Sequence, residues 1–190
     1  MPGAPRLTPL LAILFVLQAP PSLAASDLSI SEAPFGRHGR AVSASFHVAA
    51  STHAIFAVLT DYDGMPEFMP MVEEAELLES RPSGARVRFR VRSLGLFDIE
   101  EIDERNYEPP RRITWQAVKG PLAVSEGSWT LTPDRAGTRV VYQTNVEPPV
   151  PLPAFLTGML VKQGLPEFLV AIRLRAESGG RWLKPGYRPR

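Results

Sequence analysis

The last long apolar stretch of the chain, residues 153–177, constrains the fold more than any other feature. Apolar residues recur there at helical spacing in two pieces, and the second stripe is rotated by about 200° from the first. Gly164 and Pro166 lie where the phase changes, and proline is well tolerated in the first turn of a helix. We therefore predict a long, kinked C-terminal helix that must lie on a large apolar surface. The two stripes are Leu152, Phe155, Leu156, Met159 and Leu160, then Leu165, Phe168, Leu169, Ile172 and Ala176.

The charge balance and the residue types exclude several classes of protein. Lysine plus arginine number 21 and aspartate plus glutamate number 20, so the chain lacks the concentrated basic character that nucleic-acid binding requires. The absence of cysteine excludes disulfides, zinc–thiolate sites and thiol nucleophiles. The 3 histidines, His38, His47 and His53, are scattered, so we expect no metal centre and no cofactor.

Residues 1–24 have the layout of a secretory signal peptide. Arg6 supplies a positive N-terminal region, residues 10–17 form an apolar core, and Ser22 and Ala24 are the small residues that a signal peptidase recognises. The apolar run is well short of the ~20 residues that span a bilayer. We therefore expect cleavage before Ala25 and a mature protein that is periplasmic or otherwise secreted, and soluble.

The middle of the chain alternates apolar and polar residues in short segments separated by turns rich in glycine and proline. Consecutive strands with short connections favour an antiparallel meander. Residues 26–39 form a mixed polar lead-in, and a short helix is expected over 52–59, with a second one before Pro70. The expected strands span 40–48, 86–92, 97–104, 112–118, 122–132 and 138–146, with residues 72–80 leading into a turn at 81–84.

The strand 86–92 alternates arginine with apolar residues, and the next strand carries matching acids. This pattern favours a cross-strand ladder of ion pairs on a solvated face, with a strip that binds an anionic ligand or nucleic acid as the alternative. We also predict a β-bulge at Glu100 and Glu101 that returns Ile102 to the side of Phe89. If Ser93 pairs with Phe97, the opposed residues are Arg92 with Asp98, Val91 with Ile99 and Arg90 with Glu100.

Residues 178–190 combine glycine, proline and basic side chains, so we expect a flexible basic tail. Trp182 and Tyr187 would allow this tail to make transient contact with a membrane surface or a protein partner.

The segment Val58 to Pro70 carries a resemblance to a known family, because it joins a helix end, an aspartate and an aromatic residue to the pattern Pro66-x-Phe68-x-Pro70. Trp115, residues 128–131 and 137–140, and the long final helix fall where this family has its later strands and helix. The chain resembles the START-like superfamily (SRPBCC, helix-grip or Bet v 1-like), in particular its polyketide cyclase/dehydrase and coenzyme Q-binding branch. The resemblance covers roughly Val42 to Glu177, within an expected domain of residues 40–177.

The resemblance implies an α+β helix-grip fold, in which a curved antiparallel sheet of about seven strands wraps around the C-terminal helix and leaves an interior cavity. The leading hypothesis is a carrier for a small hydrophobic or amphipathic ligand, such as a lipid, a quinone or an isoprenoid-like molecule. Aromatic and methionine side chains suit such a cavity, although they also fill ordinary cores. The candidate lining residues are Phe89, Trp115, Trp129, Tyr142, Phe155 and Met159, with Phe68 and Met69 at the entrance.

Two alternatives stay open. A cyclase or aromatase-like enzyme would use the same cavity and would need a general acid or base. No catalytic residue is assigned, because no nucleophile elbow, phosphate loop or dinucleotide fingerprint occurs in the chain. An envelope interaction module would use residues 147–153 and the tail, and a filled core would favour it. The side chains available for acid–base chemistry are His47, Tyr142, Glu126 and Asp98.

Overall fold

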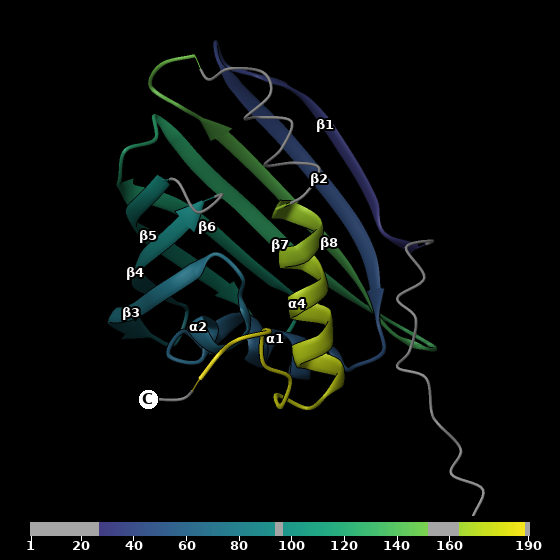
Figure 1. Cartoon of the computed structure of the whole chain (residues 1–190). Helices are drawn as coiled ribbons and strands as arrows, with labels where there is room; N and C mark the ends of the chain where they lie inside the picture. The colour runs from purple at the N-terminus through teal and green to yellow at the C-terminus, as the bar shows by residue number, and fades with distance from the viewer. Residues whose placement is uncertain (1–26, 94–96, 152–163, 189–190) are drawn as a thin grey trace, which may run out of the picture.

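A curved antiparallel sheet of 8 strands wraps around one long helix, as expected for the helix-grip fold (Figure 1). The computed structural model describes residues 27–93, 97–151 and 164–188. The strands follow the order β1-β2-β8-β7-β6-β5-β4-β3 across the sheet. The strands are β1 Ser29–Phe35, β2 Gly39–Val48, β3 Val72–Arg81, β4 Gly84–Ser93, β5 Phe97–Glu108, β6 Arg112–Lys119, β7 Val124–Asp134 and β8 Gly137–Glu147; the helices are α1 Thr52–Thr60, α2 Met65–Phe68 and α4 Leu165–Glu177.

Strand β1 lies in the segment that the sequence indicated only as a polar lead-in. It pairs with β2 along its whole length and forms one edge of the sheet. Most of its residues are exposed, and Ile30 is the residue that packs against the core. An edge strand with so little buried surface has no strong alternation of apolar residues, which is why its sequence gave little sign of it.

The ion-pair ladder on the outer face of β4 and β5 is confirmed. The predicted partners Ser93 with Phe97, Arg92 with Asp98 and Arg90 with Glu100 are all present in the register. Strand β3 adds further acids to the ladder, because it pairs with the other side of β4. The ion pairs of this ladder include Arg92–Asp98 and Arg90–Glu74, each 2.8 Å, together with Arg88–Glu76 and Arg86–Glu104.

The predicted β-bulge at Glu100 and Glu101 is wrong. The pairing of β4 with β5 continues without a shift, so Phe89 faces Glu101 and Arg88 faces Ile102. The prediction assumed that Ile102 must return to the inner face, whereas the unbroken ladder leaves it half-buried on the outer face. A register shift occurs instead in the pairing of β5 with β6, between Ile102 and Asp103. As a result, alternate residues of β5 from Glu101 onward share the face of Phe89.

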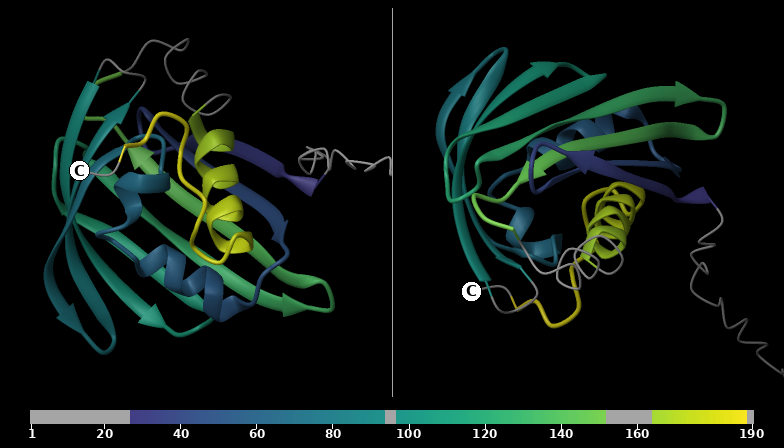
Figure 2. Two further views of the ribbon diagram at one scale, coloured as in Figure 1. Left: turned by 60° about the horizontal axis from the view of Figure 1, so that its bottom comes forward. Right: turned by 90° about the horizontal axis from the view of Figure 1, so that it is seen from above.

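Helix α4 lies on the concave side of the sheet, with α1 and α2 beside it (Figure 2). It begins at Leu165, directly after Gly164 and with a proline in its first turn, where the sequence predicted the change of phase. The preceding half of the predicted helix, with the kink, lies outside the described residues. Among the side chains most deeply buried between these layers are Phe46, Ile55, Leu59, Met65, Phe68, Leu131, Leu169 and Ile172.

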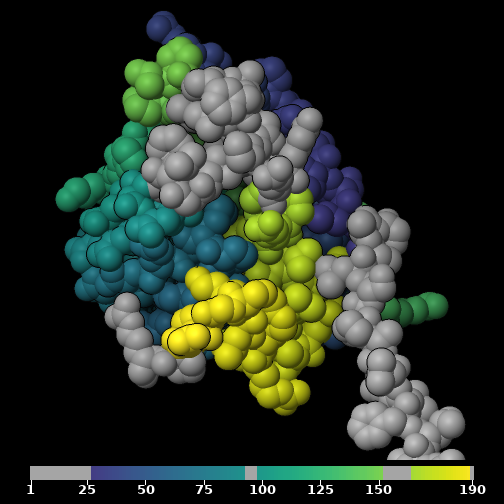
Figure 3. Space-filling model, in the orientation of Figure 1, coloured from purple at the N-terminus to yellow at the C-terminus, as the bar shows by residue number. Residues whose placement is uncertain are grey.

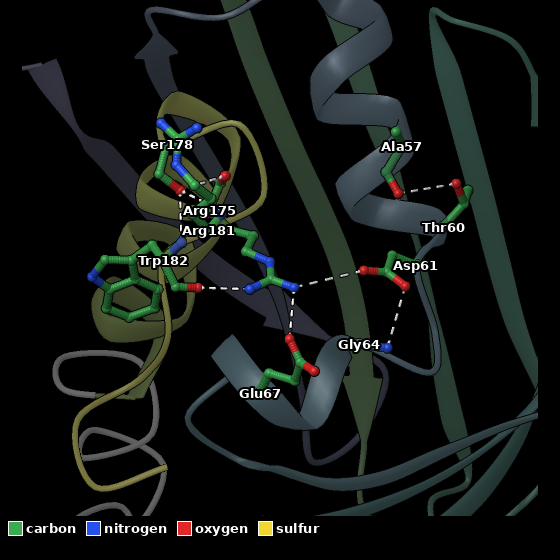
Figure 4. A network of polar contacts seen from close by, with 9 residues as sticks. All are labelled: Ala57, Thr60, Asp61, Gly64, Glu67, Arg175, Ser178, Arg181 and Trp182. Atoms are coloured by element: carbon green, nitrogen blue, oxygen red, sulfur yellow. Dashed lines mark hydrogen bonds and ion pairs between the residues drawn. The ribbon is translucent and has the colours of Figure 1, made fainter. Parts of the chain in front are cut away.

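The buried guanidinium of Arg175 connects α4 to α2 and to the segment that follows α4 (Figure 4). Its Nη2 donates to Glu67 Oε2 at 2.8 Å, and its Nη1 donates to the carbonyl oxygen of Trp182 at 2.9 Å. Its Cζ lies 5.0 Å from the ring centroid of Phe68. Asp61 adds a more distant carboxylate at 3.9 Å. This network fixes the C-terminal half of α4 against α2.

The segment after α4 packs against α2 and the start of β3, which differs from the expected flexible tail. Lys184 donates from Nζ to the carbonyl oxygens of Met69 and Val72 at 3.0 and 3.2 Å, and from its backbone N–H to that of Glu67 at 2.9 Å. Trp182 packs against the core cluster. In the space-filling view this segment (yellow) crosses from α4 to the neighbouring residues of α2 and β3 (Figure 3). No helix within the described ranges is long and apolar enough to cross a membrane.

We predict that Arg175→Met lowers the free energy of unfolding by about 2–4 kcal/mol, because it leaves the carboxylate of Glu67 and the partly buried carbonyl of Trp182 without their donor. Urea unfolding followed by circular dichroism measures the change. The matched control is Arg181→Met, whose side chain is exposed and whose effect should stay within about 0.5 kcal/mol. Equal effects of the two variants would contradict this role of Arg175.

Candidate functional site

A cavity of about 390 Å³ lies between the concave face of the sheet and the helices. Its volume falls in the range of small-molecule sites in proteins, and most of its lining side chains are apolar. Leu165 and Phe168 of α4, and Met65 and Met69 at α2, close its helical side. The sheet side is formed mainly by Val42, Phe89, Val91, Ile99, Glu101, Asp103, Arg105, Trp115, Ser125, Trp129, Tyr142, Thr144 and Val146.

An aromatic wall forms one side of the cavity, built from Trp115, Trp129, Tyr142 and Phe168. The Tyr142 ring stacks on Trp115 with centroids 5.6 Å apart and lies 4.5 Å from Trp129, while Phe168 lies 5.9 Å from Trp129. Gly127 allows this arrangement, since a Cβ there would lie 2.4 Å from the Trp115 ring and 2.3 Å from a backbone oxygen. The wall is therefore set by the strand register and by one glycine.

A row of charged side chains from β5 enters the same cavity, namely Glu101, Asp103 and Arg105. Arg105 Nη2 donates to Asp103 Oδ2 at 3.1 Å, and Asp103 is only 1% exposed. The Arg105 Cζ lies 4.6 Å from the ring centroid of Phe89 and 5.7 Å from that of Trp115. Within the described part of the chain, Glu101 Oε2, Asp103 Oδ1 and Arg105 Nε have no hydrogen-bond partner.

Burial controls the protonation of these groups. It raises the pKa of Glu101 to about 7, with the charge of Asp103 acting in the same direction and Ser125 and Arg105 opposing. Burial also raises the pKa of Asp103, against the attraction of Arg105. The pKa of Tyr142 rises to about 12, again mainly through burial. A carboxyl group that titrates near neutral pH inside an apolar cavity is able both to donate and to accept a proton.

The register places the polar lining groups toward one end of the sheet. Val146 of β8 pairs on one side with Ser125 of β7 and on the other with Arg40 of β2, near the end where β2 begins. His38 and Arg40 line the cavity there, and Arg40 Nη1 donates to the carbonyl oxygen of Gly39 at 3.0 Å. Between these residues and β5 lie β8, β7 and β6. The cavity therefore has a polar end and an aromatic body.

The family can now be assigned, because the profile of the family described as "Polyketide cyclase / dehydrase and lipid transport" matches residues 40–176. The chain belongs to this family. The solved structures that resemble it include the Zhui aromatase/cyclase of Streptomyces sp. R1128, which is 24% identical with a TM-score of 0.66, covering 76% of this chain and 97% of that one. The STAR-related lipid transfer protein of Xanthomonas axonopodis (fragment 25–204) is 20% identical with a TM-score of 0.63, covering 77% and 98%.

A START superfamily protein of Mycobacterium smegmatis is 23% identical with a TM-score of 0.63, covering 73% of this chain and 97% of that one. At these identities the likeness shows the fold alone, in agreement with the helix-grip fold that the sequence resemblance implies. None of the curated proteins matches the chain.

The structure places most of the predicted ligand-binding residues in the cavity. Those that line it are Met69, Phe89, Trp115, Trp129 and Tyr142. Phe68 is not among them; it is fully buried beneath Arg175, because α2 turns its ring into the core. Phe155 and Met159 lie outside the described residues. That the lining residues bind a ligand stays a prediction.

The sequence analysis did not identify Glu101, Asp103 and Arg105 as cavity residues, because the predicted bulge reversed which face of β5 points inward. Strict alternation continued from Ile99 would have placed Glu101, Asp103 and Arg105 beside the apolar face of β4. Of the side chains considered for acid–base chemistry, Tyr142 lines the cavity. The others make polar contacts elsewhere: His47 with Asp134 at 3.1 Å, Asp98 with Arg92 at 2.8 Å, and Glu126 with Asn145 at 3.0 Å. No cluster of three or more potential metal ligands occurs among the residues that the structure describes.

We predict that Glu101 makes stability depend on pH in the neutral range. The pKa of its carboxyl rises from 4.5 to about 7 on folding, so the folded state holds a proton that the unfolded state has released. The Glu101 carboxyl contributes its full stabilisation of the folded state below pH 4.5, and this contribution is lost as the pH rises through about 7. Relative to wild type, Glu101→Gln should therefore gain on the order of 2 kcal/mol between pH 4.5 and pH 8, as measured by urea unfolding. A difference that stays constant over this range would contradict the shifted pKa.

Proposed function

We propose that the protein binds a small hydrophobic or amphipathic molecule in the cavity between the sheet and α4. The observation that carries this proposal is the cavity itself, which combines an aromatic wall with a few polar groups at one end. An apolar ligand gains free energy when its surface leaves water for such an enclosure, and the polar groups fix its orientation.

Lipids, quinones and isoprenoid-like molecules are the ligand classes that we propose. The family description includes lipid transport, and the Xanthomonas relative is described as a lipid transfer protein. Within these classes, the clustered rings of Trp115, Trp129 and Tyr142 favour a ligand with a flat ring system, because aromatic rings pack well against one another.

A second candidate is a cyclase or aromatase-like enzyme that uses the same cavity. It is favoured by the convergence of Glu101, Asp103 and Arg105, since catalysis at neutral pH needs an acid or base that titrates there. The Streptomyces relative is described as an aromatase/cyclase. If the protein is an enzyme, Glu101→Gln should abolish turnover of a substrate that still binds in the cavity; unchanged turnover would exclude this role for Glu101. An interaction module would have been favoured by a filled core, and the cavity removes that support.

We further propose that the chain is exported, on the basis of the signal-like residues 1–24. The mass of the protein recovered from the envelope fraction of its own cells should correspond to a chain that begins at Ala25. Recovery of the unprocessed chain in the cytosol would contradict export.

We predict that Ile99→Trp blocks the cavity and weakens the binding of a neutral apolar probe at least tenfold. Ile99 lines the cavity, and an indole ring there would occupy space that the probe needs. The measurement is a titration with 1-aminoanthracene, whose fluorescence increases in an apolar site. The matched control is Ile102→Trp, which lies on the opposite face of the same strand and should leave the affinity unchanged. Failure of the wild-type protein to bind the probe, or equal losses in both variants, would contradict the proposed site.

A further inference from the structure

We propose that the charged row of β5 binds an uncharged hydroxyl group of the ligand, such as a phenol or an alcohol, and rejects a ligand that ends in a carboxylate. This inference rests on the proposed function, because it assigns the polar end of a ligand held in the same cavity. The charged row is defined as Glu101, Asp103 and Arg105.

The first argument is the unused acceptor of Asp103. Its Oδ2 accepts from Arg105 at 3.1 Å, whereas its Oδ1 has no partner within the described residues. The residue is 1% exposed and lines the cavity, so bulk water does not compensate for the missing donor. A buried acceptor without a donor is costly, and a ligand hydroxyl would supply the missing hydrogen bond.

The second argument is that Glu101, two residues earlier on the same face of β5, also has a buried carboxyl oxygen without a donor among the described residues. This oxygen is its Oε2. Each of the two carboxyl groups thus has an acceptor oxygen that receives no hydrogen bond from the residues that the structure describes, and both side chains line the cavity. A hydroxyl group can donate to either of them and can also accept from Arg105 Nε, for which the described part of the chain offers no acceptor.

The third argument is charge. One guanidinium faces two carboxyl groups, and that guanidinium is already bonded to Asp103 and lies over the Phe89 ring at 4.6 Å. A ligand carboxylate would therefore meet like charge in a region of low dielectric, where repulsion is strong. Arg40 and His38 line the cavity from β2 and the residues before it, with three strands between them and β5. The charged row itself carries two acids and one base.

The fourth argument is that the charged row adjoins the aromatic wall. The Arg105 Cζ lies 5.7 Å from the ring centroid of Trp115, which itself stacks on Tyr142. A ligand that packs its rings against this wall therefore brings substituents on its edge next to the row. The class of ligand that fits both features is a fused aromatic ring with a hydroxyl group.

The test compares naphthalene, 2-naphthol and 2-naphthoate, which share one ring system and differ in the polar group. Isothermal titration at pH 7.5 should show that 2-naphthol binds at least tenfold more tightly than naphthalene, and that 2-naphthoate binds more weakly than either. Equal affinities for the three probes, or a preference for 2-naphthoate, would overturn the inference while leaving binding in the cavity intact. If none of the three binds, the proposed function itself fails.

Variants at the row locate the effect. Asp103→Asn should reduce the preference for 2-naphthol over naphthalene, because an amide oxygen is a weaker acceptor than a carboxylate. The double variant Glu101→Gln/Asp103→Asn leaves Arg105 without an opposing charge and should reverse the order, so that 2-naphthoate binds more tightly than 2-naphthol.

The matched control for these variants is Asp98→Asn. Asp98 lies on the same strand, but its side chain points to the outer face, is 62% exposed and pairs with Arg92. It should keep the wild-type order of the three probes. A loss of preference in Asp98→Asn equal to that in Asp103→Asn would overturn the assignment to the charged row, and circular dichroism of each variant shows that the fold is retained.

Discussion

The burial of the α4 stripe is the constraint on which the rest of the structure depends. Leu169, Ile172 and Ala176 leave water because α4 packs on α1, α2 and β2 on the concave side of the eight-stranded sheet. The C-terminal half of α4 packs against α1 and α2 and is fixed there by Arg175. Its first turn, with Leu165 and Phe168, borders the cavity instead. Among the described residues, α4 therefore fills only part of the concave face, and the cavity lies in the remaining part.

The cavity differs from an ordinary core in what its strands direct into it. A core made only for stability would not contain Glu101, Asp103 and Arg105, since burying charged groups is unfavourable unless they are paired. The pairing here is incomplete, because one carboxyl oxygen of each acid has no partner among the described residues. Buried polar groups without a partner are rare in native proteins, and titratable groups with shifted pKa values cluster at functional sites. The polar end therefore supports a binding site more strongly than the apolar volume alone.

The sequence predicted the strands in which apolar and polar residues alternate strictly, and the helices that begin at a clear N-cap or proline. The helix at 52–59, the later strands, the start of the final helix and the register of Arg92 with Asp98 all follow from local patterns. Edge strand β1 was not predicted because it buries little surface. The packing of the tail was not predicted because its contacts are to backbone carbonyls that are distant in the chain. The charged row escaped because apolar periodicity assumes that charge faces water. Because β5 pairs with β4 without a bulge, the side chain of Glu101 points into the cavity. That register depends on pairing along the whole strand, which no local pattern reveals.

Native mass spectrometry of the protein recovered from its own cells tests the central claim most directly. The account predicts a discrete additional mass on the folded protein, which organic solvent extracts as an apolar molecule with a hydroxyl group and which Ile99→Trp does not retain. A protein that is recovered empty, and that stays empty after incubation with an organic extract of the same cells, would contradict the account.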